Sequence, residues 1–442
     1  MITVERKKKF DWVLLIFVGI LIIIGSIAIT SSTIMLYSKE RIIKTHFLAI
    51  FLGFLGMLLM WVLDYDILDE YSYKIYIFAL ITLVLVLIFG VVDKGSRSWF
   101  RLPFFSIQPS EFARISLIVV LSSYLSKNRD ALENLGGIIK ALFISLPFFV
   151  LMMKQPDFSG VMITIFPIAV MFIVAGVNLS YIYAFGTYIL IMLLVPFIGV
   201  IVNLYPNSLN NQFIEFLYDI SYFNFNSLIF IIILAVLMFI LWKIFHKLNP
   251  LIHFSYMVMI FLIVVSGYLS GIFVKNQIKD YQYKRIESFI HPDKDPKGSG
   301  YNIIQARVAL GSGGFKGKGI FHGSQSRLGF VPERHTDFIV SVIGEEMGFI
   351  GVIVIFASYI VFINRIRKIA LISRNNFGYF LCCGFAGLFM GYFFVNLGMI
   401  LGFFPVAGIP LAMVSYGGSN MVASLVIIGI VESIYARRMA IG

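Results

Sequence analysis

The chain has 442 residues, of which 59% are hydrophobic and 13% are charged, and its formal net charge is +12. This composition excludes an ordinary soluble globular domain and is typical of a protein that crosses a membrane many times. The positive charge does not indicate a nucleic-acid partner, because Lys and Arg lie in short loops between apolar runs and form no continuous basic face.

Apolar runs of about 20 residues predict membrane-spanning helices along the whole chain. The first run follows a basic stretch and lacks a small-residue cleavage site, so we expect a retained helix and not a signal peptide. We place these runs near residues 11–31, 45–64, 72–92, 109–126, 138–153, 158–176, 180–203, 227–245, 251–274, 347–364, 377–401 and 413–435. The prediction is an all-α polytopic membrane protein with about twelve transmembrane helices in one integral-membrane domain, residues 1–442.

The distribution of Lys and Arg predicts that both termini lie inside, because cytoplasmic loops carry an excess of these residues. On the same count the outside holds residues 93–108, residues 154–157 and a long extracellular loop, residues 275–346, whose length indicates a functional segment. Within this loop we expect a short helix over residues 301–310. Residues 311–319 are rich in glycine and are interpreted as a flexible hinge, because their spacing does not match a phosphate-binding loop.

Ionisable residues concentrate in residues 331–346, beside the start of an apolar run. Charges next to a bilayer are costly unless they pair or face a wet cavity, so the cluster indicates a functional site. Its members are Glu333, Arg334, His335, Asp337, Glu345 and Glu346. Asp337 has two interpretations, a helix cap or a general base toward a substrate hydroxyl. Glu345 and Glu346 either tune the site or order the loop.

Cations lie in the other predicted outer segments. They are Lys94, Arg97 and Arg101 around Trp99, then Arg114, Lys154 and Arg285. Arginine forks match phosphate geometry. Taken alone, most of these cations are also explained by snorkelling to lipid headgroups, and Trp99 by the interfacial aromatic belt. Arg114 lies inside a predicted helix, where the alternative is a buried pair with Glu111.

Residues 404–419 form a second signature, broken by Pro and Gly. Broken backbone at membrane depth is tolerated only against protein or a water-filled cavity. The six His residues are scattered without metal-ligand spacing, so no protein-bound metal is expected. Cys382 and Cys383 are adjacent in an apolar run, so they cannot join distant segments by a disulfide.

These stretches are parts of a larger set of motifs that covers nearly the whole chain apart from residues 204–272. The set comprises Gly95 to Phe100, Gln108 to Phe112, Gln155 to Asp157, Asp280 to Gln282 with Arg285, Asp295 and Pro296 with Gly298 to Gln305, Pro332 to Phe338, Gly344 to Glu346, Gly408 to Pro410, and Ser415 to Ser419. Together they resemble the RodA/FtsW/SpoVE family of shape, elongation, division and sporulation proteins. Arg334 makes the chain more similar to the RodA branch.

The resemblance implies a bacterial peptidoglycan glycosyltransferase that serves cell-wall elongation and cell shape. Such an enzyme polymerises lipid II at the outer face of the cytoplasmic membrane and works with a class B penicillin-binding protein. It also implies that Asp337 is the essential aspartate and that Trp99 is the important outer-loop tryptophan. Because the family has ten spans, residues 204–272 are interpreted as an inserted helical hairpin.

An α-linked sugar pyrophosphate that gives a β-linked product reacts with inversion, which requires one base and neutralisation of the leaving group. We expect Asp337 to act as the base and Trp99 to form a wall or sugar platform. The residues expected to bind substrate are Trp99, Arg114, Lys154, Arg285, Arg334, Glu345 and Glu346. No tightly bound cofactor is expected, although a Mg²⁺ or Mn²⁺ ion could accompany the pyrophosphate. The alternatives are a lipid II transporter and a scaffold for the penicillin-binding protein.

Overall fold

The structure is a computed structural model that describes residues 9–93, 96–101, 105–128, 135–205, 210–250, 253–277, 287–292, 298–329, 332–406 and 408–438. The chain divides into two compact units, Met1–Val177 with Asn302–Gly442, and Asn178–Tyr301. We refer to them as the first and the second unit. The single-domain organisation over residues 1–442 and the inserted hairpin over residues 204–272 stay predictions. A division into two compact units does not test either of them.

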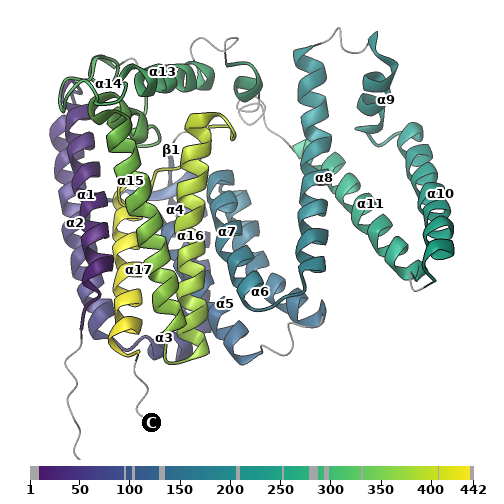
Figure 1. Cartoon of the computed structure of the whole chain (residues 1–442), viewed down its shortest axis with the longest axis horizontal. Helices are drawn as coiled ribbons and strands as arrows, with labels where there is room; N and C mark the ends of the chain where they lie inside the picture. Colours follow the sequence, from purple (N-terminus) through teal and green to yellow (C-terminus); the bar gives the residue numbers. More distant parts are fainter. Residues whose placement is uncertain are drawn as a thin grey trace, which may run out of the picture. The chain divides into compact units, whose positions relative to one another are not determined.

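The first unit is a bundle of long helices (Figure 1). These helices are α1 (Trp12–Thr33), α2 (Lys39–Val62), α4 (Ser72–Phe89), α5 (Pro109–Lys127), α6 (Leu135–Lys154), α7 (Phe158–Val174), α15 (Ile339–Leu371), α16 (Asn376–Leu401) and α17 (Gly418–Ala436). The shorter elements are α3 (Asp66–Glu70), α13 (Ser299–Ser312, in this unit from residue 302) and α14 (Ser324–Leu328). Figure 1 shows α13 and α14 at one end of the bundle.

A small antiparallel sheet interrupts the helices after α4. Its strands are β1 (Val91–Asp93), β2 (Ser96–Arg101) and β3 (Ser106–Ile107), in the order β1-β2-β3. Trp99 pairs with Val91 on one side of β2, and Phe100 pairs with Ile107 on the other. The sheet therefore turns the chain back from the end of α4 to the start of α5.

The second unit contains α8 (Leu179–Leu204), α9 (Gln212–Ile220), α10 (Phe225–Leu248) and α11 (Phe254–Gln277). Within it α11 packs against α8 and α10, around a small core of Val195, Tyr268 and Ile272. Asn224 begins α10 with a capping box, since its side chain accepts from the Ser227 amide and the Ser227 hydroxyl accepts from the Asn224 amide.

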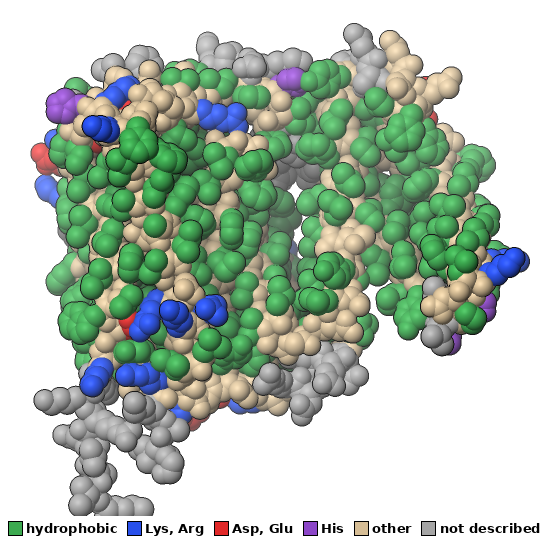
Figure 2. Space-filling model, viewed as in Figure 1, with side chains coloured by type: hydrophobic (Ala, Val, Ile, Leu, Met, Phe, Trp, Pro, Cys, Tyr) green, Lys and Arg blue, Asp and Glu red, His purple; other side chains and the backbone are tan. Residues whose placement is uncertain are grey.

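α16 lies at the centre of the first unit, in contact with α5, α7 and α15. Glycines permit this close approach. A Cβ atom at Gly387 would lie 2.8 Å from the main chain of Pro167 in α7, and one at Gly384 would lie 2.5 Å from the Ile118 side chain in α5. The helix is mostly buried, whereas α1, α2 and α4 each leave a wide apolar surface exposed. Figure 2 shows hydrophobic side chains over most of the visible flanks and Lys and Arg near helix ends.

Ten of the described helices are long and apolar enough to cross a membrane, which confirms the all-α polytopic membrane class. The count of about twelve spans is not confirmed. α5 and α7 occupy the other two predicted positions, but α7 has only 17 residues, and α5 carries Glu111 and Arg114 within its first two turns. Length and apolar composition therefore support ten of the twelve predicted spans.

The long loop predicted over residues 275–346 is also not confirmed, because its described part is largely folded. α11 continues to Gln277, α13 and α14 follow, and α15 already begins at Ile339. The short helix predicted over residues 301–310 is present as α13. From residue 302 the described part of the segment belongs to the first unit and presents ordered backbone at the end of the bundle where α15 begins.

The hinge predicted over residues 311–319 is replaced by a segment docked on α15. The amides of Lys318 and Gly319 donate to the carbonyls of Glu345 and Glu346, and the Phe349 amide donates to Gly314. α15 opens for these bonds at Gly348, where φ is 67° and ψ is −164°. A kink in a transmembrane helix thus supplies the hydrogen-bonding groups that hold this segment.

Candidate functional site

Asp337 lies in a turn over residues 332–338 that leads directly into α15. The amides of Thr336 and Asp337 each donate to the carbonyl of Glu333 at 3.1 Å. α15 begins at Ile339 with Phe338 in the N-cap position, so Asp337 is not the N-cap residue of this helix. The Asp337 side chain is half-buried, which keeps it in reach of a ligand.

Residues 404–417 pack against this turn. A Cβ atom added at Gly408, where φ is 70°, would lie 3.7 Å from Oδ2 of Asp337. The Tyr416 amide donates to the carbonyl of His335 at 2.9 Å, and the two rings lie 5.6 Å apart. The turn at residues 332–338 and the signature at residues 404–419 therefore meet, with the Asp337 carboxylate beside the main chain of Gly408.

Asn396 in α16 contacts both the Asp337 turn and the segment that contains Gly408. Its Nδ2 atom donates to the carbonyl of Asp337 at 2.9 Å and to the carbonyl of Ile409 at 2.8 Å. The side chain is fully buried in α16. Because α16 packs against α5, α7 and α15, it gives both loops a rigid support.

Tyr416 stays protonated in this arrangement. Burial raises the pKa of its phenol, and a hydrogen bond with Thr45 and the charge of Arg41 oppose this rise. The side chain is therefore a neutral polar group where residues 404–417 approach α2.

Residues 404–419 also contact the tryptophan hairpin, which is the strand pair β2 and β3 that includes Trp99. The Ser419 hydroxyl accepts from the Gln108 amide at 2.9 Å and donates to the Ser106 carbonyl at 3.1 Å. Ser106 pairs with Arg101 in the sheet that also contains Trp99, and Trp99 is half-buried. Residues 404–419 thus contact both the Asp337 turn and the strand pair that positions Trp99.

Lys154 ends α6 beside this sheet. Gln155 is fully buried, its Nε2 atom donates to the Leu83 carbonyl at 3.1 Å, and its own carbonyl accepts from Ser96 at 2.7 Å. The Lys154 side chain is exposed. Gln155 therefore holds the end of α6 against β2, while the neighbouring cation stays accessible to an anionic ligand.

Arg114 forms a buried ion pair with Glu111, which is the structural alternative to substrate binding that the sequence offered. Its Nη1 atom lies 2.9 Å from Oε2 of Glu111 and also donates to the Tyr392 hydroxyl. Tyr392 and Asn420 both donate to the same carboxylate oxygen. The charge of Arg114 is thus balanced inside the bundle, and its role in substrate binding stays a prediction.

Arg334 is anchored to the end of α1. Its Nε atom donates to the Ser32 carbonyl at 2.7 Å, and the residue is 5% exposed. Burial lowers the pKa of the guanidinium, but arginine does not lose its proton in proteins at neutral pH. Arg334 therefore adds a fixed positive charge close in sequence to Asp337.

Glu345 and Glu346 are buried and accept hydrogen bonds from protein groups. The Glu345 carboxylate accepts from Lys318 at 2.8 Å and from the amides of Gln325 and Ser326 at 2.8 Å each. The Glu346 carboxylate accepts from the Ser31 hydroxyl. These contacts correspond to the loop-ordering interpretation. Substrate contacts for the two residues stay predictions.

The interpretation of the sequence missed two residues, Asn396 and Arg307. Asn396 is a polar residue in the middle of an apolar run, which is a signal in itself because such groups need a partner inside a membrane. Arg307 caps α16 from another helix, since its Nε and Nη2 atoms donate to the carbonyls of Ile400 and Leu401 at 3.2 Å. No local pattern reveals that second contact. The third predicted phosphate-binding arginine, Arg285, lies outside the described residues.

Among the residues that the structure describes, no group of three or more His, Cys, Asp or Glu side chains is arranged to hold a metal ion. The expectation that the protein holds no metal of its own therefore stays a prediction. The described site offers two half-buried carboxylates in one turn, Asp337 and Glu333, and the Glu333 carboxylate accepts from the Thr336 hydroxyl at 3.2 Å. Cations lie on neighbouring elements. Such a site suits transfer of a proton from a hydroxyl group of a bound substrate.

The family FTSW_RODA_SPOVE, described as "Cell cycle protein", matches residues 7–231 and 226–439. The probable peptidoglycan glycosyltransferase FtsW of Trichlorobacter lovleyi is 30% identical and covers 98% of this chain and 94% of its own. The peptidoglycan glycosyltransferase MrdB of Escherichia coli is 32% identical over 88% of this chain and 84% of its own. The peptidoglycan glycosyltransferase RodA of Treponema pallidum is 30% identical over 99% of this chain and 100% of its own.

Solved structures show the same fold. A chain from a peptidoglycan synthase complex, described by its coordination of polymerization and crosslinking, matches 97% of this chain and 98% of its own with a TM-score of 0.66 and 24% identity. The rod shape determining protein RodA of Thermus thermophilus matches 98% of each chain with a TM-score of 0.59 and 22% identity.

Proposed function

Because this chain belongs to the FtsW/RodA/SpoVE family of cell cycle proteins, we propose that it is a peptidoglycan glycosyltransferase. The substrate is lipid II, and the reaction takes place at the outer face of the cytoplasmic membrane. Three similar proteins named for this activity, each at least 30% identical, support the proposal. The observation that carries it is the half-buried Asp337 at the junction of residues 332–338 and 404–417.

Asp337 acts as the general base. The 4-hydroxyl oxygen of the acceptor sugar attacks carbon 1 of the donor sugar, and its proton passes to the Asp337 carboxylate. The bond from carbon 1 to the pyrophosphate oxygen breaks, and the pyrophosphate leaves with the electron pair. Attack from the opposite face inverts the configuration at carbon 1.

Cations neutralise the charge that develops on the pyrophosphate. Lys154 suits this role because its side chain is exposed beside the tryptophan hairpin. Arg334 adds positive potential from its buried position, and Arg285 and Arg114 complete the proposed set. A Mg²⁺ or Mn²⁺ ion bound with the substrate would supply further positive charge to the leaving group, since Mg²⁺ usually keeps several waters and binds substrate phosphates.

The partner is a class B penicillin-binding protein, which crosslinks the strands that this chain polymerises. The support is the fold shared with a chain from a peptidoglycan synthase complex described by its coordination of polymerization and crosslinking. Co-purification of the two proteins from membranes, followed by crosslinking of a glycan strand by the pair, tests this part.

The function itself is tested by forming glycan strands from purified lipid II with the reconstituted protein and its partner. The wild type is compared with Asp337→Asn and with the matched control Asp69→Asn, whose carboxylate pairs with the half-exposed Lys127. Loss of a general base costs about 10²- to 10⁴-fold in rate, so Asp337→Asn is expected to lose polymerisation while Asp69→Asn keeps it. Full activity of Asp337→Asn would refute the assignment of the base.

The rival functions are separated in the same preparation. A transporter would move lipid II across the vesicle bilayer without forming strands, and a scaffold would bind the partner equally well with Asp337→Asn. Strand formation by the wild type, combined with partner binding by an inactive Asp337→Asn, supports the enzyme.

A further inference from the structure

A short helix, α9, connects two spanning helices of the second unit. α8 ends at Leu204 before it and α10 begins at Phe225 after it, and both are long and apolar enough to cross a membrane. Figure 1 shows α9 at the end of this unit where α8 stops and α10 starts. α9 has nine residues, which are too few to span a bilayer. It therefore lies at the membrane boundary.

Four phenylalanine side chains on α9 and in the turn after it are exposed. We call them the aromatic patch, which consists of Phe213 (66% exposed), Phe216 (39%), Phe223 (68%) and Phe225 (75%). A helix turns by about 100° per residue, so the exposed Glu215 lies on the side opposite Phe213. A short helix with an aromatic side and an acidic side is suited to lie in the plane of a membrane interface.

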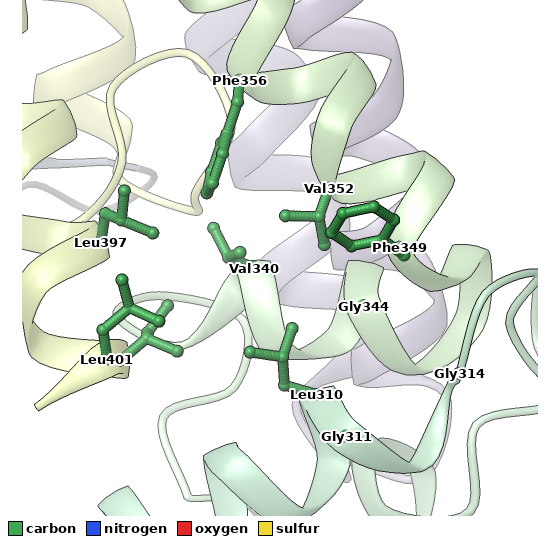
Figure 3. Close-up of a pocket in the computed structure, with 11 residues that line it drawn as sticks. Leu310, Gly311, Gly314, Val340, Gly344, Phe349, Val352, Phe356, Leu397 and Leu401 are labelled. Atoms are coloured by element: carbon green, nitrogen blue, oxygen red, sulfur yellow. The ribbon is translucent and has the colours of Figure 1, made fainter.

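Apolar side chains elsewhere in the chain have a different environment. In the first unit, Leu310, Val340 and Leu397 come from α13, α15 and α16 and border one space of about 310 Å³ (Figure 3). Protein on several sides shields these residues from the surroundings. Phe223 and Phe225 are each more than two-thirds exposed, so the medium around the protein, and not the fold, is their main contact.

Lys275, in the last turn of α11, fixes the chain at the end of α9. Its Nζ atom donates to the Ser221 hydroxyl at 2.6 Å and lies 3.3 Å from the centroid of the Tyr222 ring. The same atom lies 5.0 Å from the Tyr218 ring, and the two tyrosine hydroxyls are 2.9 Å apart. A cation is attracted to the face of an aromatic ring. We call this group of four residues the Lys275 clamp.

Two further contacts join the clamp to the helices of the second unit. The Tyr268 hydroxyl on α11 donates to the Ile220 carbonyl at the end of α9. A Cβ atom at Gly199 in α8 would lie 2.9 Å from Cε of Lys275, so the lysine stem runs close along α8. Because α8, α9 and α11 meet at this point, the orientation of α9 about its own axis is fixed.

The chain around α9 carries no positive charge of its own. Residues 205–226 contain Glu215 and Asp219 but no Lys, Arg or His. The ammonium of Lys275 is directed to Ser221 and to the tyrosine rings. Interfacial helices that bind anionic lipids carry Lys and Arg on their polar face. The charge of this segment therefore favours zwitterionic lipid, with the aromatic side chains as the source of binding energy.

We propose that α9 is an interfacial anchor that inserts the aromatic patch into the headgroup boundary of the outer leaflet, in the orientation set by the Lys275 clamp. The occupant of the patch is zwitterionic phospholipid, because the patch continues into α10, whose exposed residues Ile232 and Val236 face the hydrocarbon. Lys243 and Lys247 near the other end of α10 predict that end inside, which puts α9 outside. The anchor fixes the depth of the second unit in the membrane.

The first measurement is the depth of a nitroxide attached to Phe213→Cys, Phe223→Cys or Glu215→Cys in the full chain, in nanodiscs of phosphatidylcholine. Both native cysteines are buried, so the unsubstituted chain serves as the labelling control. Collisions with oxygen, which enters hydrocarbon, and with a water-soluble nickel complex report the depth. We expect the labels at positions 213 and 223 about 5–10 Å below the headgroup boundary. The label at position 215 should lie about 10 Å closer to water than the label at 213, since an α-helix is about 10 Å wide.

Equal access of the nickel complex to all three labels would place α9 in water and overturn the proposal. Nanodiscs that also contain phosphatidylglycerol test the charge argument. Because residues 205–226 hold carboxylates and no cation, the labels at positions 213 and 223 should keep their depth or move outward. Deeper insertion with phosphatidylglycerol contradicts the assignment to zwitterionic lipid.

The clamp is tested by Lys275→Met, which removes the ammonium and keeps most of the stem. The difference in depth between the labels at positions 213 and 215 should be lost, because α9 is then free to roll. Lys247→Met, at an exposed position near the end of α10, is the matched control and should keep the difference. Lys275→Arg restores a cation over the ring and should keep most of it.

Tyr222→Leu provides a second route to the same test, because it removes the ring and keeps the ammonium. Loss of the depth difference in this variant as well supports the clamp. An unchanged difference in both Lys275→Met and Tyr222→Leu refutes it.

A partner protein is the alternative cover for the aromatic patch. Labels at positions 213 and 223 that lose contact with both oxygen and nickel when the partner is added would make the patch a protein contact and overturn the lipid assignment. Retained access to oxygen in the presence of the partner supports the anchor. The depth of a label does not depend on strand formation, so the result stands apart from the proposed function.

Discussion

The side-chain amide of Asn396 donates a hydrogen bond of 2.9 Å to the main-chain carbonyl of Asp337. The same nitrogen donates to the Ile409 carbonyl at 2.8 Å. The Asn396 side chain is fully buried, and a buried amide group needs hydrogen-bond partners within the protein. The turn that carries the proposed base is therefore held by a residue 59 positions away, on α16.

Replacing Asn396 by Leu keeps the approximate size of the side chain and removes the donor. The Ile409 carbonyl, in a buried hydrogen bond, and the Asp337 carbonyl, in a part-buried one, then lose this donor. Leaving a buried group unsatisfied costs about 1–3 kcal/mol. We expect a lower unfolding temperature in detergent and slower strand formation. Asn376→Leu is the control, because Asn376 is exposed at the start of the same helix. Wild-type stability and rate in Asn396→Leu would show that the clamp is dispensable.

Glu345→Gln tests whether this carboxylate orders residues 318–326. The substitution removes the charge that pairs with Lys318 and weakens the acceptor of the Gln325 and Ser326 amides, where a hydrogen bond to a charged group contributes about 1.5–3 kcal/mol. Hydrogen exchange at these two amides should accelerate. Glu40→Gln, in an exposed pair with Lys44, should leave exchange unchanged. Unaltered protection at both amides in Glu345→Gln would contradict the prediction.

Gly348→Ala tests the kink in α15. Its φ of 67° and ψ of −164° belong to a region that is essentially restricted to glycine, where another residue costs about 1–3 kcal/mol. A Cβ atom would also lie 2.3 Å from the Gly317 nitrogen and 2.6 Å from the Phe315 oxygen. We expect residues 313–319 to detach, with faster proteolysis there and a lower unfolding temperature. Gly19→Ala, in an open helical position, should be neutral or stabilising.

The buried pair of Arg114 and Glu111 should behave non-additively. Arg114→Met alone leaves the Glu111 charge buried, with Tyr392 and Asn420 as its remaining donors among the described residues, and breaking such a pair costs about 3–5 kcal/mol. The double variant Glu111→Gln with Arg114→Met removes both charges and should be more stable than Arg114→Met. Equilibrium unfolding of the four proteins measures this coupling. Strictly additive losses would show that the pair contributes little.

The amino-acid sequence by itself determined the class of the protein and the positions of its helices. Hydropathy sums over neighbouring residues, and a lipid environment demands internally bonded helices, so the apolar runs at residues 11–31 and 377–401 predict helices that the structure places at residues 12–33 and 376–401. The ends are less well predicted, since the run at residues 347–364 lies inside the longer α15, residues 339–371. The sequence also identified the turn at Asp337 and the signature at residues 404–419 as candidate site segments, because charged, Pro and Gly residues stand out beside apolar runs. These two stretches were identified separately, and only the folded chain shows that they touch.

The tertiary structure decided which group each polar side chain meets. The alternative roles of Glu345 have the same local sequence, and the donors that distinguish them come from Lys318, Gln325 and Ser326, about twenty to thirty residues earlier. The sequence alone predicts a hinge at the glycine-rich residues 311–319. Their hydrogen-bond partners are carbonyls near the Gly348 kink of α15, which no local pattern reveals. Hydropathy depends on local sequence, whereas a hydrogen bond depends on two groups that only folding brings together.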